Sequence, residues 1–101
     1  MKRLSILTAL LVVAYTLPAA SAVPLKGTQY LKSVKVSPAK ARSTALAVER
    51  GTLVGWELEP ELGGSGLRYS FDIRVGHSVR EVGIDAITGK VLEDSIDTGN
   101  D

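Results

Sequence analysis

The chain contains no cysteine among its 101 residues. Small secreted domains are commonly stabilised by disulfide bonds, and the absence of cysteine excludes them here. It also excludes a lipid anchor on an N-terminal cysteine. We therefore expect the stability of the fold to depend on packing alone, so that nearly every periodic apolar residue is needed for the core.

Groups that carry catalysis or bind metal ions are also scarce. His77 is the only histidine, and neither a His-Glu-x-x-His zinc motif nor a Gly-x-Ser-x-Gly nucleophile motif occurs. The glycine-rich segment 63–66 has no lysine and is not followed by a helical pattern, so it is not a phosphate-binding loop. We expect no catalytic residue, no metal site and no cofactor, and we interpret His77 as an exposed turn residue. The sequence predicts that the protein is not an enzyme.

Positive charge is not concentrated in any part of the chain. Lys2 and Arg3 are two of the twelve basic residues, so the rest of the chain has ten against eleven acidic residues, a net charge of −1. The ten are scattered singly among Glu and Asp. No basic patch is available to neutralise a run of phosphates, which argues against a nucleic-acid partner. The same scatter argues against electrostatic attachment to a membrane.

Residues 1–22 have the pattern of a secretory signal peptide. Two positive charges at residues 2–3 precede an apolar run that ends at Pro18, and the small residues 19–22 supply a cleavage site. We expect export and cleavage after residue 22, which gives a periplasmic or secreted protein with no stable membrane anchor. The alternative is an uncleaved anchor, because residues 4–25 carry no charge, although Pro18 disfavours a spanning helix.

The rest of the chain divides into an arm, a domain and a short tail. We place the N-terminal arm at residues 23–36, the domain at 37–97 and a frayed tail at 98–101. Pro24 and Gly27 interrupt the arm. Its sequence fits either a short helical turn or a segment docked on the domain.

The domain begins with a helix that we expect to pack on a sheet. Ser37 is typical of a helix N-cap, and it is followed by a proline, which is favoured at the first helical position. The pattern predicts a helix over residues 38–50, stopped by Gly51. Ala41, Ala45 and Val48 repeat at helical spacing, with Leu46 beside them. This face is mostly alanine, and small side chains allow a helix to lie close to a sheet.

After the helix the apolar residues recur with period two, which is typical of strands with one buried face. The alternating apolar residues are Val54, Trp56 and Leu58 in a first strand, Tyr69, Phe71, Ile73 and Val75 in a second, and Val82 and Ile84 in a third. Gly76-His77 is a two-residue hairpin turn, and residues 90–93 can add a short last strand. We predict an α+β fold in which one helix covers one face of a three- to four-stranded antiparallel sheet, a helix followed by a β meander.

Two features of the first strand each have two interpretations. Glu57, Glu59 and Glu61 occupy alternate positions. They form either an acidic stripe for a cationic partner or metal ion, or the solvated face of an amphipathic strand, which is the usual reason for such alternation. Trp56 is in phase with the apolar residues. It is either a core residue or, where partly exposed, an anchor for a partner.

The segment 36–97 resembles the PepSY domain family. The resemblance rests on the order and spacing of residues 36–37, Ala41, residues 45–46, Gly51, and the segments 54–59, 69–73 and 82–92. Gly83 is a departure, since glycine weakens the interior of a strand. The resemblance implies a helix-and-sheet binding module that is found in propeptides of secreted metallopeptidases and as free-standing exported bacterial proteins. It implies no catalytic residues.

Asp85, in the last of these segments, has a structural interpretation. An aspartate can accept hydrogen bonds from backbone N–H groups ahead of it, near Thr88, and Gly89 supplies a positive φ. A lone aspartate does not make an oxygen cage for a metal ion. We therefore interpret Asp85 as a turn residue.

Two functions follow from these observations. The preferred hypothesis is an exported, non-catalytic binding module with a protein partner, which restrains a peptidase or binds another cell-envelope protein, with an edge strand available for pairing. The alternative is a small periplasmic sensor that binds an ion or ligand through the acidic strand face formed by Glu57, Glu59 and Glu61.

Overall fold

The computed structural model describes residues 22–99. Its elements in chain order are strand β1 (Leu25–Lys26), the 3₁₀ helix η2 (Thr28–Ser33), helix α1 (Pro38–Val48), and strands β2 (Thr52–Pro60), β3 (Leu67–Val75), β4 (Ser78–Asp85) and β5 (Val91–Ile96). The signal peptide expected over residues 1–22 lies, apart from its last residue, outside the described residues. Within residues 22–99, no helix is both long enough and apolar enough to cross a membrane.

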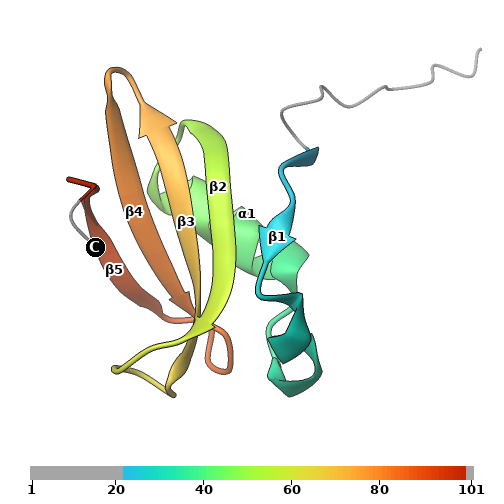
Figure 1. Cartoon of the computed structure of the whole chain (residues 1–101). Helices are drawn as coiled ribbons and strands as arrows, with labels where there is room; N and C mark the ends of the chain where they lie inside the picture. The colour runs from blue at the N-terminus through green and yellow to red at the C-terminus, as the bar shows by residue number, and fades with distance from the viewer. Residues whose placement is uncertain (1–21, 100–101) are drawn as a thin grey trace, which may run out of the picture.

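The strands form one sheet in the order β1-β2-β3-β4-β5, and α1 lies against one face of it (Figure 1). Every neighbouring pair from β2 to β5 is antiparallel, and β1 pairs with β2 in parallel. The predicted α+β architecture is confirmed. The sheet has one strand more than the three to four expected because the arm supplies β1.

Helix α1 begins as its sequence predicts and ends earlier. The Ser37 hydroxyl accepts a hydrogen bond from the backbone N–H of Lys40 at 3.1 Å, and a proline occupies the first turn. The helix ends at Val48, two residues before the predicted end, and Glu49 is already extended. Gly51 does not adopt a positive φ; a Cβ there would collide with the Arg74 carbonyl, so glycine is needed for close approach to β3.

The core lies between α1 and the sheet. Ala41 and Ala45 of the helix are fully buried, and α1 contacts β3 and β4. The remaining buried apolar residues come from the strands and the turn after β4: Leu53, Leu58, Tyr69, Phe71, Ile73, Val82, Ile84 and Ala86. Because alanine side chains are small, the helix backbone can lie close to these larger side chains. The larger side chains then fill the space between the helix and the sheet.

Two core predictions are wrong. Val48, the third residue of the predicted helix stripe, is 38 % exposed, because α1 ends at this residue and only Ala41 and Ala45 of the helix are buried. The second is Val54. A β-bulge lies between Leu53 and Gly55, so Leu53 is buried opposite Ile73 whereas Val54 is 38 % exposed. The extra residue of a bulge reverses the side-chain alternation, and the period-two pattern read back from Leu58 therefore puts Val54 on the wrong face.

The arm is attached to the sheet at several points. In β1, Leu25 pairs with Trp56, and the Trp56 indole N–H donates to the Val23 carbonyl oxygen at 2.7 Å. Gly27 has a φ of 82°, and a Cβ there would collide with the Leu58 carbonyl. At the end of the arm, the Tyr69 hydroxyl donates to the backbone carbonyl of Val36 at 2.7 Å. Of the two conformations that the arm sequence allowed, both occur: a helical turn, and a docked strand.

Candidate binding surface

The face of the sheet opposite α1 is polar and has no helix over it within residues 22–99 (Figure 1). We call it the open face. Strand register places on it Glu57 opposite Ser70, Asp72 opposite Glu81, and Gly83 between Ser70 and Glu93. A one-sided core of this kind is common in antiparallel sheets, and the uncovered face is then available for contacts with other molecules.

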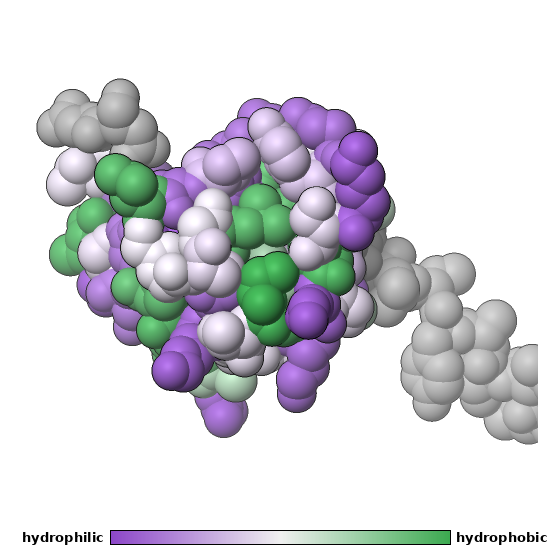
Figure 2. Space-filling view, turned by 90° about the horizontal axis from the view of Figure 1, so that it is seen from below, coloured by the Kyte–Doolittle hydropathy of each residue, from purple (hydrophilic) through white to green (hydrophobic). Residues whose placement is uncertain are grey.

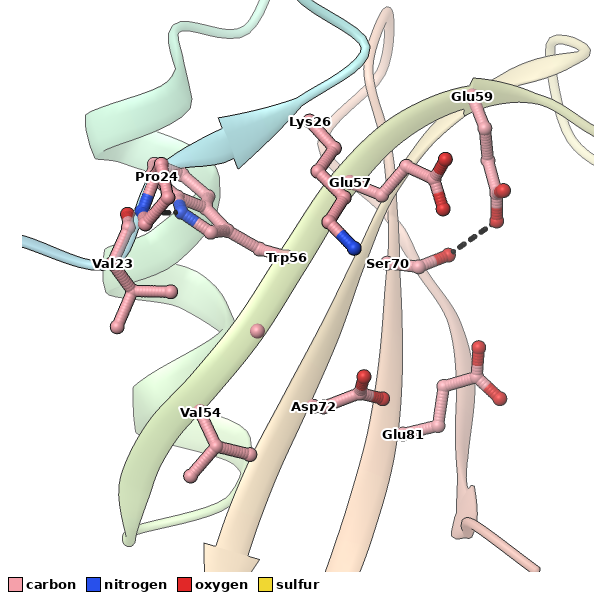
Figure 3. Close-up of a pocket in the computed structure, with 11 residues that line it drawn as sticks. Val23, Pro24, Lys26, Val54, Trp56, Glu57, Glu59, Ser70, Asp72 and Glu81 are labelled. Carbon is pink, nitrogen blue, oxygen red and sulfur yellow. Dashed lines mark hydrogen bonds between the residues drawn. The ribbon is translucent and has the colours of Figure 1, made fainter. Parts of the chain in front are cut away.

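A hollow of about 310 Å³ lies on the open face beside β1 and β2. Four carboxylates line it, those of Glu57, Glu59, Asp72 and Glu81, and Figure 3 shows them on the same side of the strands. The other lining residues are Val23, Pro24, Lys26, Val54, Gly55, Trp56 and Ser70. The hollow is therefore acidic, with an apolar end formed by the arm and the start of β2.

Trp56 belongs to both the core and this hollow. Its ring lies 5.6 Å from that of Phe71, measured between centroids, and the Arg42 guanidinium lies 5.5 Å from the Trp56 ring. The side chain is half-buried and packs against the core cluster. The structure thus places Trp56 against the core, and because the side chain is partly exposed, a role as an anchor for a partner stays a prediction.

A second hollow of about 480 Å³ adjoins the first and is lined by Glu59, Pro60, Glu61, Glu81 and Glu93. Partial burial, together with the neighbouring carboxyl of Glu59, raises the pKa of Glu61, although Arg68 acts in the opposite direction. Burial is the larger cause, and the carboxylates of Glu59 and Glu93 add to it by repulsion. A cation brought to this hollow would be attracted by the neighbouring carboxylates.

Arg68 is the basic residue at the centre of this region, and it is only 7 % exposed. Its guanidinium contacts Glu93 at 3.3 Å and Glu61 at 3.8 Å. The side chain crosses Gly83, where a Cβ would stand 3.3 Å from both the Arg68 Nη1 and the Glu93 Cβ. The glycine that weakens β4 as a strand therefore leaves room for a buried arginine between two carboxylates.

Charge is divided between the two layers of the molecule. Residues 27–51, which include η2 and α1, contain five basic residues and one acidic residue. Residues 52–97, which form the sheet, contain nine acidic and four basic residues. Such a separation of charge would attract a positively charged molecule to the sheet rather than to the helix.

Asp85 is 1 % exposed and joins two loops. Its Oδ1 accepts hydrogen bonds from the backbone N–H groups of Ile87 at 2.8 Å and Thr88 at 3.1 Å, as the turn interpretation predicts. The carboxylate also accepts from the N–H and the hydroxyl of Ser65, both at 2.7 Å, which the sequence did not reveal. Burial alone would raise the pKa of Asp85, but the bonds from Ser65, Ile87 and Thr88 outweigh it and hold that pKa well below its usual range.

The sequence-selected residues are only partly brought together. Glu57 and Glu59 lie on the open face as proposed, and Glu61 lies just beyond the end of β2. His77 is exposed in the β3–β4 turn, far along the chain from these acids. The part of the chain that the structure describes contains no group of three or more His, Asp or Glu residues placed to hold a metal ion.

Three acidic residues of the surface were missed by sequence reasoning: Asp72, Glu81 and Glu93. Asp72 and Glu81 lie opposite each other because Gly76-His77 closes a two-residue hairpin, with Val75 opposite Ser78. Counting residues outward in both directions from this turn would have predicted that Asp72 and Glu81 are cross-strand partners. Glu93 has no such signal, since β5 follows a longer turn and a bulge lies at its start.

Comparison with known proteins agrees with this architecture. Residues 35–94, more than half of the chain, match the family model described as the peptidase propeptide and YPEB domain, PepSY. No curated protein and no solved structure matches the chain. The matched segment contains α1 and strands β2 to β4, together with most of β5. The chain therefore belongs to the PepSY domain family, whose description points to a peptidase propeptide-like binding module.

Proposed function

We propose that the protein is an exported, non-catalytic module that binds a positively charged surface of a secreted peptidase or another envelope protein on its open face. The observation that carries this proposal is the continuous acidic surface formed by the two hollows, on the face that the helix leaves uncovered. Membership of the PepSY family supports a protein partner. The pattern of residues 1–22 supports a periplasmic or secreted location.

Asp85, Ser65 and His77 do not form a catalytic triad. Asp85 is committed to four hydrogen bonds within the fold, and Ser65 to binding it. His77 stands at an exposed turn on another part of the sheet. A nucleophile, a base and a residue that orients the base have to lie within hydrogen-bond reach of one another, and this combination is not built from these three side chains.

The experiment is affinity capture from the envelope and secreted fractions of the producing organism. The wild-type protein is compared with the triple variant E57Q/D72N/E81Q, and K32Q/K35Q/K40Q serves as a matched control on the helical layer. We expect a partner that is retained by the wild type and the control, is lost with the acidic-face variant, and elutes with rising salt. Recovery of no specific protein at any salt concentration would overturn the proposal.

The second candidate function is a sensor that binds an ion on the acidic face. It predicts that heat of binding is measured when a metal ion is titrated into the protein. Calorimetry of the wild type with calcium, copper and zinc separates the two functions. Silence with all three metals removes the sensor, whereas binding that disappears in E57Q/D72N/E81Q would favour it over protein recognition. The open face gives this candidate carboxylates but, among residues 22–99, no cluster with the arrangement of a metal site.

A further inference from the structure

The loop between β2 and β3 exposes one apolar side chain almost completely. Leu62 is 96 % exposed, whereas the next most exposed large apolar residue among those described, Ile96, is 58 % exposed. Single exposed apolar residues are common on protein surfaces. Leu62 differs from the ordinary case because the backbone that carries it is held in place.

Two buried charged residues fix this loop from inside the fold. Arg68 donates from Nη2 to the backbone carbonyl of Leu62 itself at 3.1 Å. Asp85 accepts two hydrogen bonds of 2.7 Å from Ser65. Within the loop, the Gly66 N–H donates to Gly63, and the Gly66 carbonyl accepts from Glu61, each at 3.1 Å. A loop ordered before binding loses little conformational entropy when it binds.

The shape of the loop depends on its glycines. Gly64 has a φ of 55°, and a Cβ there would collide with the Asp85 carboxylate and stand 2.8 Å from Leu92. Gly63 has a φ of 107°, which disfavours any residue with a side chain. The glycine-rich segment that the sequence marked only as a loop tip is therefore a turn of defined geometry that presents Leu62.

The surroundings of Leu62 are acidic on one side. Pro60 and Glu61 line both the hollow at the loop and the second hollow of the open face. Figure 2, which looks at the end of the molecule where this loop lies, shows apolar patches among hydrophilic side chains. The complementary surface on a partner is an apolar pocket with basic groups along one rim.

We propose that the 61–66 loop is a preformed recognition loop whose Leu62 side chain enters the apolar specificity pocket of an endopeptidase. This inference deepens the proposed function and rests on it. The rigid loop supplies the apolar anchor, and the adjoining acidic face supplies the contacts that orient the complex. Pre-organised backbones of this kind are typical of peptidase–inhibitor complexes, which change little on binding.

The test is inhibition of three purified endopeptidases by the full-length protein. Thermolysin and chymotrypsin accept apolar side chains, whereas the pocket of trypsin has an aspartate at its base. We expect inhibition of at least one of the first two and not of trypsin. Leu62→Ser should weaken that inhibition about 10- to 100-fold, the effect of losing one buried leucine side chain. Leu62→Arg should transfer inhibition to trypsin.

Ile96→Ser is the matched control, because it removes an exposed apolar side chain from β5, and it should leave inhibition unchanged. Thermal melting should give the same midpoint for all Leu62 variants, since the side chain contacts solvent. If the wild type inhibits and Leu62→Ser inhibits equally, the loop proposal is wrong and the proposed function stands. If no enzyme is inhibited, or the chain is cut after residue 61 or 62, the loop proposal is also wrong, and the capture experiment alone decides the proposed function.

Discussion

The two faces of the sheet are stabilised in different ways. On the covered face, Leu58, Phe71 and Ile84 have no accessible surface and belong to one core cluster with the alanines of α1. On the open face, order comes from ion pairs and hydrogen bonds such as those of Arg68 with Glu93 and of Ser70 with Glu59. Burial of one apolar side chain contributes about 1.5–3 kcal/mol, whereas an ordinary hydrogen bond contributes about 0.5–1.5 kcal/mol net. Arg68 is the exception on the open face, because it is buried and its charge depends on its carboxylate partners.

This difference separates folding from recognition. The covered face specifies strand order and register, because a slip of one residue would expose the whole apolar set. Apart from the buried Arg68 and its partners, the side chains of the open face contribute little to stability, so Glu57, Asp72 and Glu81 can be arranged for a partner at small cost. Substitutions on the two faces should therefore have different consequences, and three of them test the contrast.

The largest effect is expected for Phe71→Ala. Phe71 is fully buried between Trp56 and Tyr69, with ring centroids at 5.6 and 6.2 Å. Its truncation should lower the free energy of unfolding by about 3–5 kcal/mol, because it leaves a cavity that the helix cannot fill. Urea denaturation measures this loss. Val54→Ala, an apolar truncation on the other face, is the control and should cost less than half as much; equal losses would break the contrast.

An intermediate effect is expected for Asp85→Asn. In asparagine an amide nitrogen replaces one carboxylate oxygen and would face one of the N–H or O–H donors that now bind Asp85. At least one charge-assisted hydrogen bond is therefore lost, which should lower the free energy of unfolding by about 1.5–3 kcal/mol. Because the pKa of Asp85 is lowered by folding, its contribution is fully present above about pH 4 and is lost as the pH falls further.

Unfolding free energy measured between pH 7 and pH 2 should therefore fall less steeply in Asp85→Asn than in the wild type. Asp97→Asn, which changes an aspartate that bonds only the exposed N–H of Gly99, is the control. Parallel pH profiles for wild type and Asp85→Asn would show that the carboxylate is not the source of acid sensitivity.

The smallest effect on stability is expected for Glu57→Gln. Glu57 is exposed and lines the hollow on the open face. The substitution should change the free energy of unfolding by less than about 0.5 kcal/mol, as surface changes usually do. The same urea experiment applies, with Leu58→Ala as the neighbour that points to the other face. A loss of more than about 1 kcal/mol in Glu57→Gln would show that the open face also holds the fold together.

The sequence was informative where a local pattern has one physical solution. The N-cap serine, the alanine spacing and the Gly76-His77 turn led to a helix and an antiparallel hairpin, and both are present. Tyr69, Ile73 and Ile84 are buried as the period-two pattern requires. These features depend on neighbours within a few residues of one another in the chain.

Other features depended on contacts that no local pattern encodes. The bulge that turns Val54 outward occurs within a run that keeps apparent alternation. Strand β1 is only two residues long, too short to show a period-two pattern, and its parallel partner β2 lies more than twenty-five residues further along the chain. The Ser65–Asp85 contact joins residues twenty apart, and either partner alone reads as an ordinary turn residue.

Sharing one carboxylate makes two loops behave as a single unit. If Ser65 moves away, the Asp85 carboxylate loses hydrogen bonds that keep it ionised, and it then binds the N–H groups of Ile87 and Thr88 less strongly. If the loop at residues 86–89 opens, the Asp85 carboxylate is no longer held in place to accept from Ser65. Opening one loop therefore favours opening the other, and the free energies of the two events are not additive. Residues 63–66 and 86–89 thus melt or persist together, although β3 and β4 stand between them in the chain.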